Sequence, residues 1–202
     1  MATEKRRALV QLLAPLPPTA PVPAYPLHLA VAPTKNIERI EWLLEKAVEM
    51  GLSAFTPLLC ARSERRQLRV DRLEKIALAA MKQSLHLHLP TIAELTPMQQ
   101  FLQQLPAASL AYIAHCHEGT QRSFLPNLLE FLPSHNPLQQ PIYVLIGAEG
   151  DFTADEVNAA QAAGCRAVTL GNTRLRTETA ALAAACMVAQ HNFTLASAAP
   201  KP

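Results

Sequence analysis

Two short glycine-bearing stretches near the C-terminus combine an adaptable backbone with fixed charge. They are I-G-A-E-G-D-F at 146–152 and L-G-N-T-R-L-R-T-E-T-A at 170–180. Glycine lets the backbone come close to a ligand, so that its N–H groups act as donors. In the second stretch, Arg174, Arg176 and Glu178 add charge beside these donors. Together the two stretches predict one small-molecule site with an ionic rim.

The sequence contains no familiar phosphate loop and no paired metal motif. Neither G-x-G-x-x-G nor G-x-x-x-x-G-K-[ST] occurs, which disfavours a dinucleotide site and a P-loop. His86-x-His88 and H-C-H-E at 115–118 contain metal-binding residue types, but neither has a second spaced Cys or His pair. We therefore predict no metal, and we interpret His115 as part of the small-molecule site.

Each charged stretch follows an apolar run and precedes an alanine-rich helical pattern. Strands separated by helices predict a mostly parallel α/β sheet with helices on both faces. In such sheets, ligands bind in loops at the carboxyl ends of the strands. The expected strands are 27–32, 55–59, 108–114, 143–146 and 166–170.

Polar residues predict where the helices begin. Thr34 is the expected N-cap of a helix that stops at Gly51, and the last helix is expected over 178–191. Two pairs with capping-box spacing are expected to start the helices between them, Asp71 with Glu74 and Thr153 with Glu156.

Composition indicates a globular enzyme domain in the cytoplasm. The chain has 202 residues, of which 50% are hydrophobic and 17% charged. The formal net charge is only +2, so contact with nucleic acid must come from local patches. The four cysteines form no C-x-x-C pair, as expected for reduced thiols. No apolar run approaches the roughly 20 residues of a membrane span.

The motifs I-G-x-E-G-x-F and L-G-x-x-x-L-R-x-E-T-A-A resemble those of the small-subunit ribosomal RNA uridine N3-methyltransferases of the SPOUT superfamily. The stretch 35–51 is similar to the family's first catalytic-domain helix. In addition, 57–63 resembles its arginine-bearing loop, and 82–84 (K-Q-S) its glutamine–serine motif. The resemblance covers residues 27 to 193.

Three positions depart from the family pattern. Ala148 stands where the family usually has proline, Asp151 where a second glycine is common, and Ala61 where glutamate often precedes the arginine.

The resemblance implies a SPOUT-type fold with a C-terminal trefoil knot. Residues 27–202 would be the catalytic domain. Residues 1–26 would be a remnant strand, at most 5–13, and a stiff linker, because six of the seventeen prolines fall between 15 and 26. The PUA-like barrel that precedes this linker in the family would be missing or truncated. The resemblance also implies a homodimer, with the exposed face of the last helix as its interface.

The resemblance further implies S-adenosylmethionine as cofactor. The three loops at 114–119, 147–152 and 170–175 would wrap it together. The expected cofactor-binding residues are His115, Gly147, Glu149, Gly150, Leu170, Gly171 and Leu175. For Glu149, a salt bridge to a nearby arginine is an equally good interpretation.

The implied acceptor, N3 of uridine, carries a proton, and its removal spreads negative charge onto O2 and O4. A fixed guanidinium stabilises that charge. Arg176, oriented by Glu178, is the first catalytic candidate and Arg62 the second. The alternative for Arg176 and Glu178 is an ion pair with structural value only.

Ribosomal RNA or the small ribosomal subunit is the implied partner, and spaced arginines can hold its phosphates. The RNA-binding candidates are Arg62, Arg65, Arg66, Arg69 and Arg174. A solvated helix face would explain the same cluster. Two other functions stay open: ribose 2′-O or guanine N1 methylation of RNA, and a cofactor-binding domain that is inactive without its RNA-binding domain.

Overall fold

The computed structural model describes residues 23–117, 119 and 121–198, together with residue 11 and two short strands. These strands, β1 (Thr3–Glu4) and β2 (Arg7–Ala8), pair in antiparallel orientation. The strand expected within 5–13 and most of the Pro-rich linker lie largely outside the described residues.

The other strands form one sheet of eight, in the order β5-β4-β3-β9-β7-β10-β8, with β6 paired to β4. Every pairing in it is parallel. Parallel neighbours need crossover connections, which here are mostly helices. The predicted parallel sheet is therefore confirmed. Its strands are β3 (Leu27–Val31), β4 (Leu52–Leu59), β5 (Thr91–Ile92), β6 (Thr96–Pro97), β7 (Leu110–Ala114), β8 (Ser123–Phe124), β9 (Ile142–Ile146) and β10 (Arg166–Thr169).

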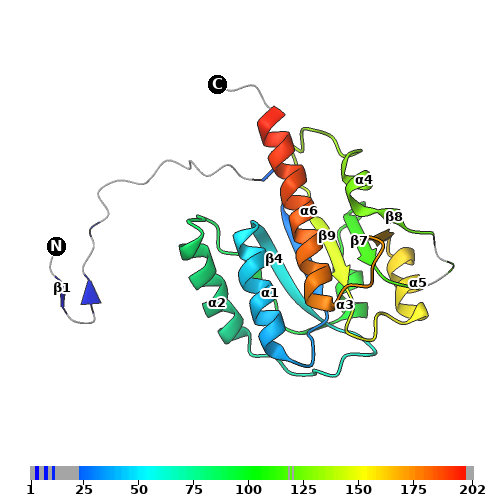
Figure 1. Ribbon diagram of the computed structural model, residues 1–202, viewed down its shortest axis with the longest axis horizontal. Coiled ribbons are helices and arrows are strands. Elements are labelled where there is room, and N and C mark those ends of the chain that lie inside the picture. The colour runs from blue at the N-terminus through cyan, green and yellow to red at the C-terminus, as the bar shows by residue number, and fades with distance from the viewer. Residues whose placement is uncertain are drawn as a thin grey trace.

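Helices cover both faces of this sheet, as predicted (Figure 1). Helices α1, α2, α4 and α6 pack on one face, and α3 and α5 pack on the other. The helices are α1 (Ile37–Glu49), α2 (Val70–Gln83), α3 (Met98–Gln104), α4 (Leu125–Leu129), α5 (Ala154–Ala162) and α6 (Thr177–Ala198).

The central strand β9 has no charged residue and packs against helices on both of its faces. In β9, Ile142, Val144 and Ile146 point to the α1/α6 side, and Leu145 points to the α3/α5 side. This alternation with a period of two, with no polar side, is typical of a parallel sheet covered by helices. Because β7 pairs with β9 and with β10 in parallel orientation, the carboxyl ends of these three strands lie at the same edge of the sheet.

Two of the predicted helix starts are wrong. The N-cap of α1 is Asn36, whose side chain accepts from Glu38 N at 3.0 Å, whereas Thr34 is buried and donates to the Asn36 carbonyl. Helix α2 begins after Arg69 without a side-chain cap. The Asp71 carboxylate, which was expected to take part in a capping box, pairs with Arg69 instead.

The predicted start of α5 is confirmed, since Thr153 and Glu156 form a complete capping box. The strand expected over 108–114 begins only at Leu110, because Ala108 has a left-handed φ of 59° in a turn. Helix α6 is longer than expected, and α3 and α4 were not predicted. Both are short, and their apolar residues are too few to show a period.

The chain enters the sheet through a clamp at the amino end of β3. Asn192 of α6 accepts from Tyr25 N at 2.9 Å and donates to the Tyr25 carbonyl at 2.8 Å. The Tyr25 ring is buried and its hydroxyl donates to the Pro133 carbonyl. These contacts hold the end of the Pro-rich segment at the edge of the sheet opposite the carboxyl ends of the strands. No helix in the described part of the chain meets the length and apolarity needed to cross a membrane.

Candidate functional site

A cavity of about 1050 Å³ opens at the carboxyl ends of β7, β9 and β10. Its walls include parts of the three loops that the resemblance implies, with different bounds. The lining residues are 114–116 and Arg122, 146–151 at the end of β9, and 168–177 at the end of β10 with Ala180. The cavity lies at the upper end of the roughly 300–1,000 Å³ range of small-molecule sites.

Gly147 closes the loop after β9 tightly. A Cβ added there would lie 3.0 Å from the Phe152 backbone nitrogen, so any side chain would force this loop apart. The Gly147 carbonyl accepts a hydrogen bond from the buried hydroxyl of Thr177 at 3.1 Å. Through this bond the first turn of α6 is fixed to the end of β9.

Asp151 explains one departure from the family pattern. Its φ is +62°, a left-handed conformation that aspartate tolerates better than most side chains do. Its carboxylate accepts from Cys116 N at 2.7 Å and from Phe152 N at 2.8 Å. Aspartate here thus replaces the conformational freedom of glycine and also joins the loops after β7 and β9.

Arg62 supports the cavity from outside. Its guanidinium donates to the Gly150 carbonyl at 2.5 Å and more weakly to the Phe152 carbonyl at 3.4 Å. Its aliphatic carbons lie where a side chain on Gly150 would stand. Arg62 does not line the cavity, and its observed contacts support the loop after β9. The catalytic role considered for it stays a prediction.

Glu149 lines the cavity and also ties it to the start of α1. One carboxylate oxygen accepts from the backbone N–H of Lys35 at 3.0 Å. The arginine partner considered from the sequence is not found among the described residues. The other carboxylate oxygen stays available to a ligand.

The loop after β10 brings two arginines to the cavity. Gly171 has a φ of +149°, and a Cβ added there would meet no other atom within 4 Å, so the loop backbone faces open space. Leu170 and Leu175 are half-buried and line the wall. Arg174 and Arg176 are exposed along the same wall.

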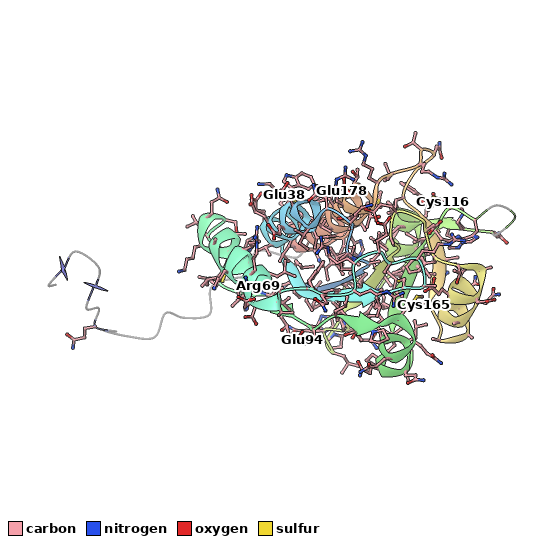
Figure 2. The ribbon with its side chains drawn as sticks, turned by 90° about the horizontal axis from the view of Figure 1, so that it is seen from below. Glu38, Arg69, Glu94, Cys116, Cys165 and Glu178 are labelled. Carbon is pink, nitrogen blue, oxygen red and sulfur yellow. The ribbon has the colours of Figure 1, made fainter. Side chains whose placement is uncertain are left out.

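The expected pairing of Arg176 with Glu178 is wrong. Glu178 is only 7% exposed, and its Oε1 lies 3.8 Å from Nε of Arg39 on α1. Figure 2 shows Glu178 beside Glu38, which directly precedes Arg39 in the first turn of α1. A helical turn sends Glu178 toward α1 while Arg176, which precedes the helix, stays at the cavity. Among the described residues, no ion pair or side-chain hydrogen bond engages the Arg176 guanidinium.

His115 lines the cavity and is buried. Its Nδ1 accepts from the backbone N–H of His117 at 3.2 Å, so in the neutral ring the proton is on Nε2. Burial, reinforced by the Arg122 charge, lowers the pKa of His115. Nε2 is buried, and no described residue accepts a hydrogen bond from it.

The RNA-binding candidates on the arginine-rich segment are largely engaged within the chain. Arg65 donates to the carbonyls of Thr34 and Lys35, and Arg69 pairs with Asp71. Figure 2 shows Arg69 far from Cys116, which lines the cavity. Of the sequence candidates outside the cavity, Arg66 is exposed beside a second hollow of about 440 Å³.

Sequence reasoning missed Arg122 and Thr177 as parts of the site. Arg122 lies in a loop without periodicity or glycine signature, so no pattern marked it. Thr177 lies between Arg176 and Glu178, and only the charged residues of that motif were considered as site residues. In the described residues, no group of three or more His, Cys, Asp or Glu side chains is arranged to hold a metal ion.

A family model described as RNA methyltransferase domain matches residues 21–189. The chain is similar to the ribosomal RNA small subunit methyltransferase E of Rickettsia conorii, with 29% identity over 163 residues. That alignment covers 80% of this chain and 63% of the relative, so the chain spans less than two thirds of the relative's length.

Two solved structures resemble the chain closely in fold. The probable rRNA-methyltransferase of Porphyromonas gingivalis shares 39% identity at a TM-score of 0.75, over 84% of this chain and 69% of that one. A ribosomal RNA small subunit methyltransferase E from Neisseria gonorrhoeae, bound to S-adenosyl methionine, shares 30% identity at a TM-score of 0.65. That match covers 80% of this chain and 64% of the Neisseria chain. The SPOUT-type α/β fold is confirmed, and the trefoil knot stays a prediction.

Proposed function

Since this chain belongs to the RNA methyltransferase domain family, we propose that it transfers a methyl group from S-adenosylmethionine to N3 of a uridine in small-subunit ribosomal RNA. One observation carries the proposal. Three loops at the carboxyl ends of β7, β9 and β10 line a single cavity, and Arg176, whose guanidinium has no partner among the described residues, stands on its wall. The Neisseria relative, bound to S-adenosyl methionine, supports the choice of cofactor.

The cavity suits an adenosyl ligand rather than a polyphosphate. When bound, S-adenosylmethionine supplies an electrophilic methyl group on its sulfonium. Backbone groups of Gly147, Gly150 and Gly171 can bind adenine and ribose, and the apolar walls come from Leu170 and Leu175. The remaining oxygen of Glu149 can accept from a ribose hydroxyl or from an ammonium.

Arg176 has the role of stabilising charge on the substrate. As the N3 proton leaves to water or to a carboxylate, negative charge appears on O2 and O4 of uracil. A guanidinium held beside these oxygens favours the anion and hence the attack of N3 on the methyl group. Arginine does not itself take the proton, because its pKa lies far above neutrality.

The cofactor assignment predicts a clear ligand selectivity. S-adenosylmethionine and S-adenosylhomocysteine should bind, whereas ATP and NAD should bind far more weakly, because the loops contain no cradle for phosphates. Isothermal titration calorimetry with the four ligands measures this. Tighter binding of ATP than of S-adenosylhomocysteine would contradict the assignment.

RNA is the proposed partner, through the exposed side chains of Arg66 and Arg174. We further propose that the enzyme works as a cytoplasmic homodimer. On the last helix, Phe193 is 68% exposed and Cys186 is exposed, and an unpartnered apolar side chain there suits an interface. Since Arg62, Arg65 and Arg69 are held within the chain, a separate RNA-binding module ahead of residue 23 would supply most of the affinity.

The modified position is tested by the product nucleoside. Small ribosomal subunits incubated with S-adenosylmethionine and this chain, fused behind a family-type barrel domain, should yield 3-methyluridine by mass spectrometry. The same incubation with the unfused chain should yield much less, because few cavity-side arginines remain to hold RNA. Ribose 2′-O-methylation or 1-methylguanosine in place of 3-methyluridine would overturn the N3 assignment.

A further inference from the structure

Arg122 is a cation on the cavity wall for which the mechanism above gives no role. It precedes β8, is half-buried, and donates from its guanidinium to the His115 carbonyl. This bond uses one of the five N–H donors of the group. The bond also holds the guanidinium in place, so that the remaining donors are oriented before a ligand arrives.

No carboxylate of the described residues forms an ion pair with Arg122. The two acids on the cavity wall are already engaged elsewhere. Asp151 accepts from Cys116 N and Phe152 N, and Glu149 accepts from Lys35 N. A partly buried guanidinium without an anionic partner is costly unless a ligand supplies one.

The buried Nε2 of His115 lies in the same wall segment. No described residue accepts a hydrogen bond from it, and Arg122 is bound to the carbonyl of this same residue. Among the described residues, the Arg122 guanidinium therefore has one acceptor, the carbonyl of His115, and its other N–H groups are open to a ligand. These donors call for an anion with at least two acceptor oxygens.

We propose that Arg122 forms a carboxylate subsite that binds the methionine end of the cofactor. This inference rests on the proposed function, since it names where one part of S-adenosylmethionine is recognised. The guanidinium fork matches a carboxylate in a bidentate geometry. Arg174 and Arg176 are less suited to this task because they are exposed and are not held by the backbone.

The cavity then has a polarity that matches the ligand. Arg122 would hold the carboxylate, and the acidic side chains Glu149 and Asp151 on the same cavity wall would favour the positively charged ammonium and sulfonium. Arg176 is left free for the substrate base. The subsite thus separates the arginine that holds the cofactor from the arginine that acts on uracil.

The test compares two ligands that differ by one group. Decarboxylated S-adenosylmethionine lacks only the carboxylate, so it reports binding without this subsite. In calorimetry, Arg122→Gln should weaken the binding of S-adenosylmethionine by about 10- to 100-fold, the range for hydrogen bonds to a charged group. Binding of the decarboxylated ligand should change by less than about threefold. Arg122→Lys, which keeps the charge but loses the fork, should recover part of the loss.

Several outcomes would overturn the subsite. Equal weakening of both ligands by Arg122→Gln would show that Arg122 only shapes the loop through the His115 carbonyl. Unchanged affinity for S-adenosylmethionine, with weaker binding of ribosomal RNA, would show that the anion is an RNA phosphate. If the unsubstituted protein binds neither ligand, the proposed function itself fails and the subsite fails with it. A thermal unfolding curve of each variant identifies losses that come from unfolding.

Discussion

Replacing Arg176 with alanine is expected to lower the methylation rate by about two orders of magnitude or more, the usual effect of losing one preorganised donor. Affinity for the cofactor should stay nearly unchanged. The reason is that the Arg176 guanidinium makes no side-chain bond within the described residues that would shape the cofactor walls. Its contribution arises only when negative charge develops on uracil. Single-turnover methylation and calorimetry with S-adenosylhomocysteine measure the two quantities separately.

Two further variants sharpen this test. Arg176→Lys should recover little activity, because a point ammonium cannot span two acceptors as a planar fork does. Arg166→Ala makes the same substitution at an exposed arginine of β10 that does not line the cavity, and it should retain full activity. An unchanged rate in Arg176→Ala, or a loss of the fold, would show that this arginine is structural.

Gly171→Val is expected to act in the opposite way, by removing the cofactor. A β-branched residue at a φ of +149° is strained, and the strain costs roughly 1–3 kcal/mol. The side chain would also occupy open space beside the cavity, where the cofactor is expected to contact the protein backbone. Together these effects should weaken S-adenosylhomocysteine binding by about 100-fold or more.

The matched control is Gly164→Val. Gly164 also has a positive φ, +93°, and its Cβ position is equally open, yet it lies between α5 and β10 and does not line the cavity. This variant should lower the thermal unfolding temperature by a similar amount and leave ligand affinity intact. If both variants lost affinity equally, general destabilisation would account for the effect of Gly171→Val.

The layers of this fold were predictable because they follow from periodicity and local chemistry. An apolar run such as 143–146 between two helical patterns predicts a buried strand, and the capping box of Thr153 and Glu156 forms within one helical turn. The start of α1 was missed because local chemistry did not decide it. Thr34 and Asn36 are both good caps, and only the burial of Thr34 under the tertiary structure decides between them.

The sequence predicted which individual loops contribute residues to the cavity. Glycines and charges at the ends of β9 and β10 identified two walls of the cavity. What joins the walls was not predictable, because Asp151 reaches Cys116 and Arg122 reaches His115 only after the strands are ordered side by side. The partner of Glu178 is likewise set by the packing of α1 against α6.

The clamp at Tyr25 fixes where any chain segment ahead of it enters the domain. Asn192 fixes the incoming chain near the far end of α6, a helix of 22 residues and hence about 33 Å in length, whose first turn borders the cavity. Under the proposed function, an RNA-binding module joined ahead of residue 23 would enter at the side of the sheet opposite the cavity. Exchanging such a module would leave the described contacts of the cavity walls unchanged. We therefore expect the exchange to change which RNA is bound while affinity for the cofactor stays the same.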